Sequence, residues 1–259
     1  MVLAFLSVIS GKTDGSCLIL LVKRGNRMIT GQKKNAKIDL LILLAVTLAM
    51  LVIYIILGER ISAVLAAPGI AVLAKVGLVA FFQFGVTGLG IVILSLWRRE
   101  TLGQYGLRRK GLRKALLLSA LCCLPEFLCH LVQQGWQGYF PFSGVMTTQM
   151  VLESALPTQI AGMAITVICW GFWEGFFYPV LRNKIDALLP SKHRFWSFGS
   201  LVGALWCIFS HGMVGTSPAI LPQMLCTMIL IYGMLLVQKE TGNAWGCVAI
   251  FCFYWNAIR

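Results

Sequence analysis

Ionisable side chains are rare in the apolar stretches of this 259-residue chain, and three of its polar residues could together activate a water molecule. Glu174 lies in an apolar run that begins near Ile160, whereas His211 and Asn256 lie in two later runs. A charged side chain at the centre of a bilayer costs about 2.5 to 3.5 kcal/mol on insertion scales, so it is seldom retained without a use. In one cavity, Glu174 would act as general base, His211 would orient the water or donate a proton, and Asn256 would stabilise an oxyanion.

A second carboxylate and imidazole, Glu126 and His130, lie in the apolar run before Glu174. They are four residues apart, so a helix would place them on one face. Each Glu–His combination has an alternative interpretation, as a buried pair kept for structure or for moving protons or ions. A divalent metal is a further alternative, but the chain has no His-Glu-x-x-His motif and the spacing specifies no metal. A glutamate-based mechanism would require no cofactor.

The composition indicates a polytopic membrane protein. The chain is 58% hydrophobic and only 12% charged, whereas soluble domains carry about 25% charged residues. Its formal net charge of +13 comes from short basic tracts between apolar runs. Such tracts indicate membrane topology and contacts with anionic lipids. No soluble basic domain remains to bind nucleic acid, so nucleic acid is excluded as a partner.

Seven apolar runs approach the length of about 20 residues that a membrane-spanning helix needs. We therefore predict an all-α bundle of about seven transmembrane helices. The predicted spans are Leu40–Gly58, Val76–Trp97, Ala115–Val132, Ile160–Leu181, Phe195–Met213, 219–237 and 244–258.

The distribution of basic residues predicts the orientation of these spans. With seven spans, 19 of the 22 Lys and Arg residues fall on one side, which the positive-inside rule makes cytoplasmic. The N-terminus is then cytoplasmic, and we expect the protein in the cell membrane. The long loop 133–158 on the opposite side has no Lys or Arg. Its segment 145–156 is predicted to be a short helix, either packed at the interface or acting as a lid.

One membrane domain accounts for nearly the whole chain. Residues 1–37 form a basic tail, and residues 38–259 form the membrane domain. Met28 opens a basic tail of the kind that commonly precedes a first span. Residues 1–27 are therefore interpreted as a mis-called upstream start or a disordered tail.

Three sequence blocks after residue 102 stand in a characteristic order. They are Trp173-Glu-Gly-Phe-Phe-Tyr178, Phe209-Ser-His-Gly212, and Thr241-Gly-Asn-Ala-Trp245 with Trp255-Asn256 at the end of the same run. In these blocks, residues 102–259 resemble the CPBP family, the CAAX prenyl proteases and bacteriocin-processing intramembrane proteases. The Trp-Glu-Gly-Phe motif resembles a divergent branch of that family.

The resemblance implies a protease-like core at 102–259 and hydrolysis of a peptide bond within the membrane. The expected substrate is a prenylated, otherwise lipidated or membrane-embedded peptide. The residues implied for catalysis are Glu174, His211 and Asn256. Glu126, His130 and Arg182 are candidate auxiliary groups. The alternatives are a non-catalytic scaffold that binds membrane clients, or a proton-coupled transporter, against which the absence of inverted repeats argues.

The sequence departs from the family motifs at four positions. Gly175 and Pro179 stand where the motif Glu-Glu-x-x-x-Arg has its second Glu and its Arg, and Arg182 comes three residues late. Cys207 stands at the Phe of Phe-x-x-x-His, and Cys252 at the His of His-x-x-x-Asn.

Overall fold

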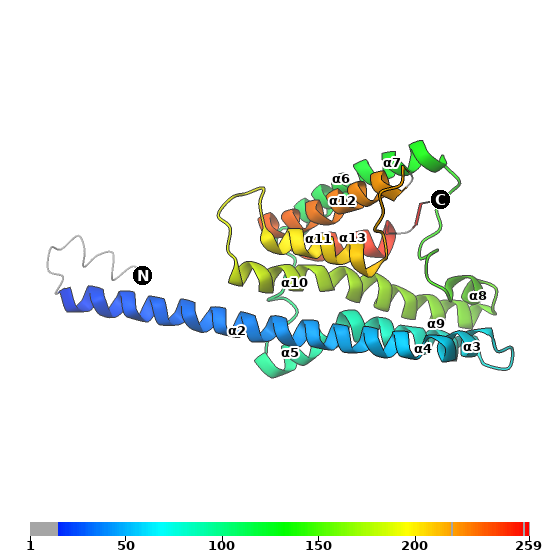
Figure 1. Ribbon diagram of the computed structural model, residues 1–259, viewed down its shortest axis with the longest axis horizontal. Helices are drawn as coiled ribbons and strands as arrows, with labels where there is room; N and C mark the ends of the chain where they lie inside the picture. The colour runs from blue at the N-terminus through cyan, green and yellow to red at the C-terminus, as the bar shows by residue number, and fades with distance from the viewer. Residues whose placement is uncertain (1–14, 219, 256, 259) are drawn as a thin grey trace.

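The computed structural model describes residues 15–218, 220–255 and 257–258, with side-chain surroundings from residue 35 onward. The described residues form helices and connecting turns, with no strand among them (Figure 1). The elements are α2 (Gly15–Ile56), α3 (Gly58–Ala66), α4 (Val72–Phe84), η1 (Gly85–Leu89), α5 (Gly90–Arg98), α6 (Leu112–Cys122), α7 (Leu124–Gln134), α8 (Thr148–Leu152), α9 (Leu156–Thr166), η2 (Val167–Trp173), α10 (Glu174–Leu188), α11 (Phe198–Ser210), α12 (Ile220–Thr241) and α13 (Trp245–Phe253).

Five helical segments in the described part of the chain are long and apolar enough to cross a membrane. They are Asn35–Ile56, Val72–Arg98, Leu112–Gln134, Leu156–Leu188 and Ile220–Thr241. The prediction of an all-α protein with membrane-spanning helices is confirmed at this level. The two remaining apolar helices, α11 and α13, contain 13 and 9 residues and are shorter than a span.

One predicted local feature is confirmed and one is corrected. The Glu174 helix continues to Leu188, just before Pro190, past the predicted end of this span at Leu181. A short helix, α8, lies within the segment predicted at 145–156. The predicted tail is helical from Gly15, and this helix, α2, continues without interruption into the first apolar segment. The N-terminal part of α2 extends beyond the other helices (Figure 1). Residues 1–14 lie outside the described part.

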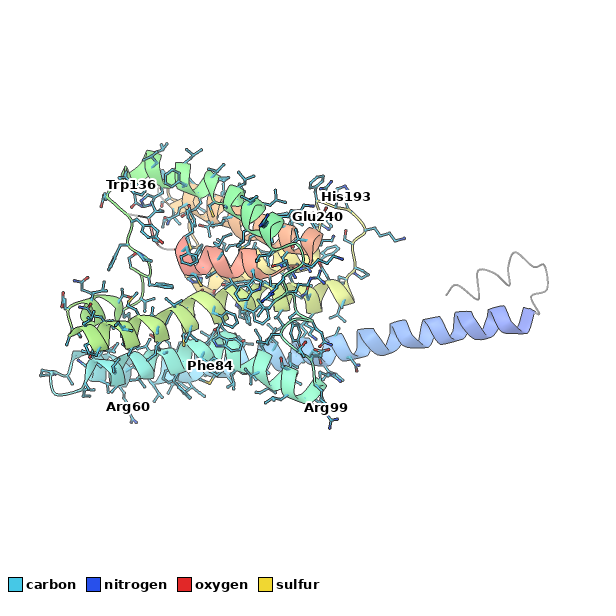
Figure 2. The ribbon with its side chains drawn as sticks, turned by 180° about the vertical axis from the view of Figure 1, so that it is seen from behind. Arg60, Phe84, Arg99, Trp136, His193 and Glu240 are labelled. Carbon is cyan, nitrogen blue, oxygen red and sulfur yellow. The ribbon has the colours of Figure 1, made fainter. Side chains whose placement is uncertain are left out.

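Charged residues lie at both ends of the bundle (Figure 2). Arg99, His193 and Glu240 lie at the end from which α2 extends, and Arg60 and Trp136 lie at the opposite end (Figure 2). This separation is what helices that run from one membrane surface to the other would produce.

A buried ion-pair cluster joins helices at the end where α2 extends. The carboxylate of Asp39, which is 3% exposed, accepts bonds of 2.8 Å from both Arg98 and Lys184. Lys184 also lies 3.5 Å from Glu100. These partners hold the lysine, whose side chain is 12% exposed, inside the protein.

Small residues set the spacing between helices at two interfaces. A Cβ on Gly199 would lie 2.4 Å from the Arg182 carbonyl oxygen, so α11 packs directly on the backbone of α10. Gly171 and Gly175 instead face α13, where added Cβ atoms would meet Cys252 and Phe251. Glycine permits these approaches because nothing projects from its Cα.

Two π-helical segments, η1 and η2, interrupt the long apolar helices and lie against each other. A Cβ on Gly88 of η1 would come within 2.9 Å of the Trp173 ring of η2. Such π-helical insertions occur frequently at functional sites because they shift the register of the side chains on either side. Here η1 begins two residues after Gln83, and η2 ends immediately before Glu174.

Candidate functional site

The side chains of Glu174 and His211 are in contact across the α10–α11 interface. The Glu174 Oε1 atom lies 3.1 Å from His211 Nε2. The carboxylate side chain is 6% exposed and the imidazole 27% exposed. α10 begins at Glu174, and His211 is the residue that ends α11. The two residues predicted to act together are therefore in direct contact.

Gln83, a residue that the sequence analysis did not select, binds the other oxygen of the same carboxylate. Its Nε2 donates to Glu174 Oε2 over 2.6 Å. The glutamine lies in α4, outside the segment that resembles a protease. A lone amide in an apolar span, followed by glycines at 85, 88 and 90, was the available signal.

The second ring nitrogen of His211 faces the end of its own helix. Nδ1 lies 2.9 Å from the Cys207 carbonyl oxygen and 3.2 Å from the Ser210 hydroxyl oxygen. If Nδ1–H donates to the carbonyl, Nε2 faces Glu174, and the contact between them requires one proton. Either partner can hold that proton. A carboxylate and an imidazole that share a proton are suited to general acid–base chemistry.

The pair opens into a cavity of about 420 Å³. Polar groups are few, and the walls are largely aromatic. The aromatic lining consists of Tyr54, Phe82, Phe142, Trp170, Phe177, Tyr178, Trp206, Phe251 and Trp255. The 133–158 loop contributes Phe142 and residues 144–146 to the wall, and the Trp255 ring lies edge-on to His211 at 5.3 Å between centroids. A mostly apolar cavity with few polar groups is typical of a small-molecule or substrate site.

The auxiliary candidates Glu126 and His130 do not line this cavity. They lie together in a separate narrow pocket with Cys129 and three glutamines. Glu126 accepts a hydrogen bond from the Tyr254 hydroxyl. The structure therefore places the two Glu–His pairs in different pockets. Residues of similar depth on different helices can face different neighbours, and depth alone does not determine that direction.

Arg182 is also absent from the cavity of Glu174. Eight residues separate them on α10, which at 1.5 Å per residue is about 12 Å along the axis. Arg182 is 7% exposed and pairs with Asp186 at 3.3 Å. Asn256 lies outside the described residues, so its predicted role stays a prediction. The described residues contain no cluster of three or more metal-ligating side chains.

We predict that the Gln83–Glu174 bond contributes to stability because the carboxylate is buried. Gln83→Leu would keep the size of the side chain and leave Glu174 Oε2 without its donor. Since hydrogen bonds to charged groups contribute about 1.5 to 3 kcal/mol, we expect a loss of that order in the free energy of unfolding in detergent.

A matched control is a second glutamine–glutamate hydrogen bond, which lies at the protein surface. Gln149 donates to Glu153 over 2.7 Å at the protein surface. Gln149→Leu should change stability by less than about 0.5 kcal/mol. Equal losses of unfolding free energy in the two variants would show that the Gln83 contact stabilises the protein no more than the exposed one.

No protein-family model, curated protein or solved structure matches this chain.

Proposed function

We propose that the chain is an intramembrane peptidase that hydrolyses a peptide bond with water activated by Glu174 and His211. The observation that carries the proposal is the contact of a buried carboxylate with an imidazole at 3.1 Å on the wall of a cavity. The resemblance of the three sequence blocks to CPBP proteases supports the same chemistry. The proposed fold is likewise that of an intramembrane CAAX-type protease.

In the proposed mechanism, Glu174 takes a proton from the attacking water as the oxygen bonds to the substrate carbonyl carbon. His211 then supplies a proton to the leaving nitrogen as the C–N bond breaks. Gln83 orients the Glu174 carboxylate by its bond to Oε2. The Cys207 carbonyl orients the imidazole through Nδ1, as a third group does for the base in other hydrolases.

The lining of the cavity is evidence for an apolar or membrane-embedded substrate. Its aromatic walls could surround a lipid chain or the apolar side chains of a helix end. We therefore propose a lipidated or membrane-embedded peptide as substrate. A proton relay through Glu126, His130 and Glu174 is less well supported, because the first two line a different pocket from the third.

We propose seven crossings with a cytoplasmic N-terminus, in the cell membrane. In this arrangement the short helices α11 and α13 pack along α10 and α12. Each crosses the membrane together with the residues that flank it. The gathering of Arg99 and Glu240 at one end and Trp136 at the other supports two opposite surfaces (Figure 2).

The orientation predicts which positions are open to labelling from outside intact cells. A single cysteine placed at Gly138 should react with a membrane-impermeant maleimide, whereas cysteines at Lys110 and Lys192 should react only after permeabilisation. All three positions are in connecting loops. Labelling of position 110 but not 138 from outside would contradict the orientation.

Hydrolysis itself is tested with the purified protein in lipid nanodiscs and a set of prenylated and acylated peptides in water enriched in oxygen-18. Mass spectrometry should show cleavage with one heavy oxygen in each new carboxyl group. Peptides that bind without being cleaved would replace this proposal with the scaffold alternative.

A further inference from the structure

We propose that a second cavity, at the end of the bundle where α2 extends, binds a phosphate group carried by a phospholipid headgroup or by a free phosphate ester. The cavity measures about 480 Å³ and is separate from that of Glu174. This inference does not depend on the proposed hydrolysis.

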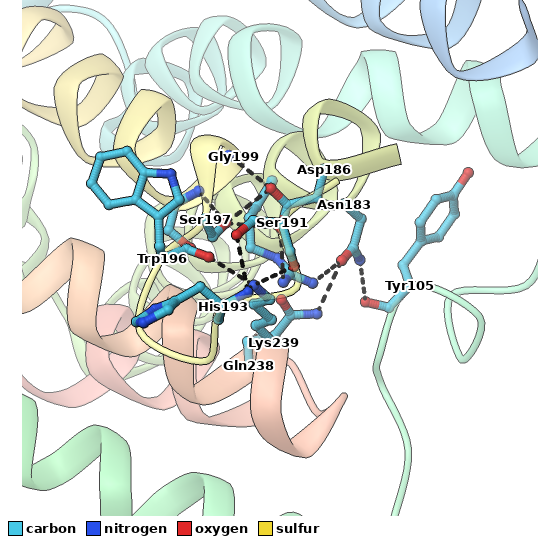
Figure 3. Close-up of polar contacts among 12 residues, drawn as sticks. Tyr105, Asn183, Asp186, Ser191, His193, Trp196, Ser197, Gly199, Gln238 and Lys239 are labelled. Carbon is cyan, nitrogen blue, oxygen red and sulfur yellow. Dashed lines mark hydrogen bonds and ion pairs between the residues drawn. The ribbon is translucent and has the colours of Figure 1, made fainter. Parts of the chain in front are cut away.

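Four segments far apart in the chain build the walls. α2 contributes Asp39, the loop after α5 contributes residues 104–106, α10 contributes Asn183, and α12 contributes Gln238. Asn183 connects two of these walls: it donates to the Tyr105 carbonyl and accepts from Gln238, each over 3.5 Å (Figure 3). The cavity is thus formed by the packing of distant segments, and not by one loop alone.

The negative charges of the cavity already have partners. Asp39 accepts from Arg98 and Lys184, and Glu100 accepts from the Tyr105 hydroxyl. Burial, together with the Glu100 carboxylate, holds the pKa of Tyr105 well above its usual value, so its hydroxyl keeps its proton and remains a donor. Neither carboxylate is left to attract a cation.

Two guanidinium groups, by contrast, keep unused donors. Arg182 is 7% exposed; its Nη1 pairs with Asp186 and its Nη2 donates to Asn183, whereas its Nε has no hydrogen-bond partner among the described residues. Its partner Asp186 also accepts from Ser197 and from the Gly199 backbone, so that carboxylate is shared. Arg108 makes one bond of 3.3 Å, to the backbone carbonyl of Thr241. Arginine matches phosphate because its planar fork presents parallel N–H donors.

The balance of charge selects an anion. Four basic side chains line the cavity or pair with residues of its wall: Arg98, Arg108, Arg182 and Lys184. Three carboxylates oppose them, those of Asp39, Glu100 and Asp186, so the group carries one excess positive charge. A phosphate group with a single negative charge, as in a phosphodiester, would neutralise it. The Gln238 Oε1 atom, on the same wall, is also buried without a partner among the described residues.

The test measures binding to the full-length protein in detergent and phosphate-free buffer at constant ionic strength. The probes are short-chain phosphatidylglycerol and glycerol phosphate, and the comparison is a short-chain diacylglycerol, which carries no phosphate. Binding to the folded state raises the thermal midpoint as probe concentration rises, and the titration gives an affinity. The variants are Arg108→Gln and Arg182→Gln, and the matched control is Arg109→Gln, an exposed neighbour that does not line the cavity.

We expect Arg108→Gln to weaken binding about tenfold or more, as loss of a charged hydrogen bond would, and Arg109→Gln to change it less than about twofold. Stabilisation by phosphatidylglycerol alone assigns the phosphate to a lipid headgroup, and stabilisation by glycerol phosphate as well assigns it to a free ester. Equal weakening in the Arg108 and Arg109 variants, or no stabilisation by either probe, would overturn the proposal. Arg108 lies at the surface, so its variant remains informative if Arg182→Gln does not fold.

Discussion

Glu174→Gln is expected to lower the rate of peptide hydrolysis at least about a hundredfold, because general-base catalysis contributes about 10² to 10⁴. The amide keeps the shape of the side chain and can still accept from Gln83, but it cannot take the proton from water. The fold should persist, since the pair at the α10–α11 interface loses one charge without losing volume. Hydrolysis in nanodiscs and the thermal midpoint measure the two effects separately.

His211→Ala should reduce hydrolysis to a similar degree, since it removes the partner 3.1 Å from the carboxylate. The matched control is Glu126→Gln, which removes a second carboxylate from an apolar helix. Because Glu126 lies in a different pocket and pairs with Tyr254, we expect its variant to retain activity within about twofold. Unchanged hydrolysis in the Glu174 and His211 double variant would end the enzyme proposal.

Introducing the second glutamate of the CPBP motif with Gly175→Glu is expected to prevent the protein from accumulating in its folded form. A Cβ at this position would lie 2.9 Å from both the Val248 Cα and the Phe251 Cβ, and 3.1 Å from the Cys247 carbonyl oxygen. Two of these three atoms belong to the backbone of α13, which cannot move aside as a flexible side chain could. The added carboxylate would also be buried without a partner.

Gly175→Ala gives a graded version of the same test. Forcing one methyl group into this contact should cost about 1 to 3 kcal/mol of stability. Gly77→Ala is the control, because nothing lies within 4 Å of a Cβ at this other helical glycine. There the helix propensity of alanine should make the change neutral or stabilising by up to about 1 kcal/mol. Similar midpoints in the two alanine variants would refute the close packing of α10 on α13.

The same packing explains how the site differs from the family motifs. Cys252, at the motif position of the last histidine, lies against Gly171, where a Cβ would be 2.7 Å from its sulfur atom. Cys252 is not part of the cavity wall, whereas its neighbours Phe251 and Trp255 are. Gln83 supplies a polar contact to the carboxylate from a helix outside the resembling segment.

The sequence by itself determined the helical class, the long apolar segments and the choice of Glu174 and His211 as candidate site residues. These depend on composition, on the length of apolar runs and on the cost of a charge in an apolar helix, all of which are local properties. The extension of α10 to Leu188 agrees with the proline at position 190, because proline disfavours helical backbone in the residue before it.

Only the tertiary structure decided which polar residues meet. The glycine contacts set how α10 and α13 approach, and that approach turns Glu174 toward Gln83 and His211 while Glu126 and His130 remain in another pocket. It also places Arg182 in the second cavity instead of beside Glu174. The direction in which a side chain points depends on how its helix is rotated and shifted against distant neighbours. A helix that is apolar on every side could face lipid or protein with any of them, so its sequence does not specify that rotation.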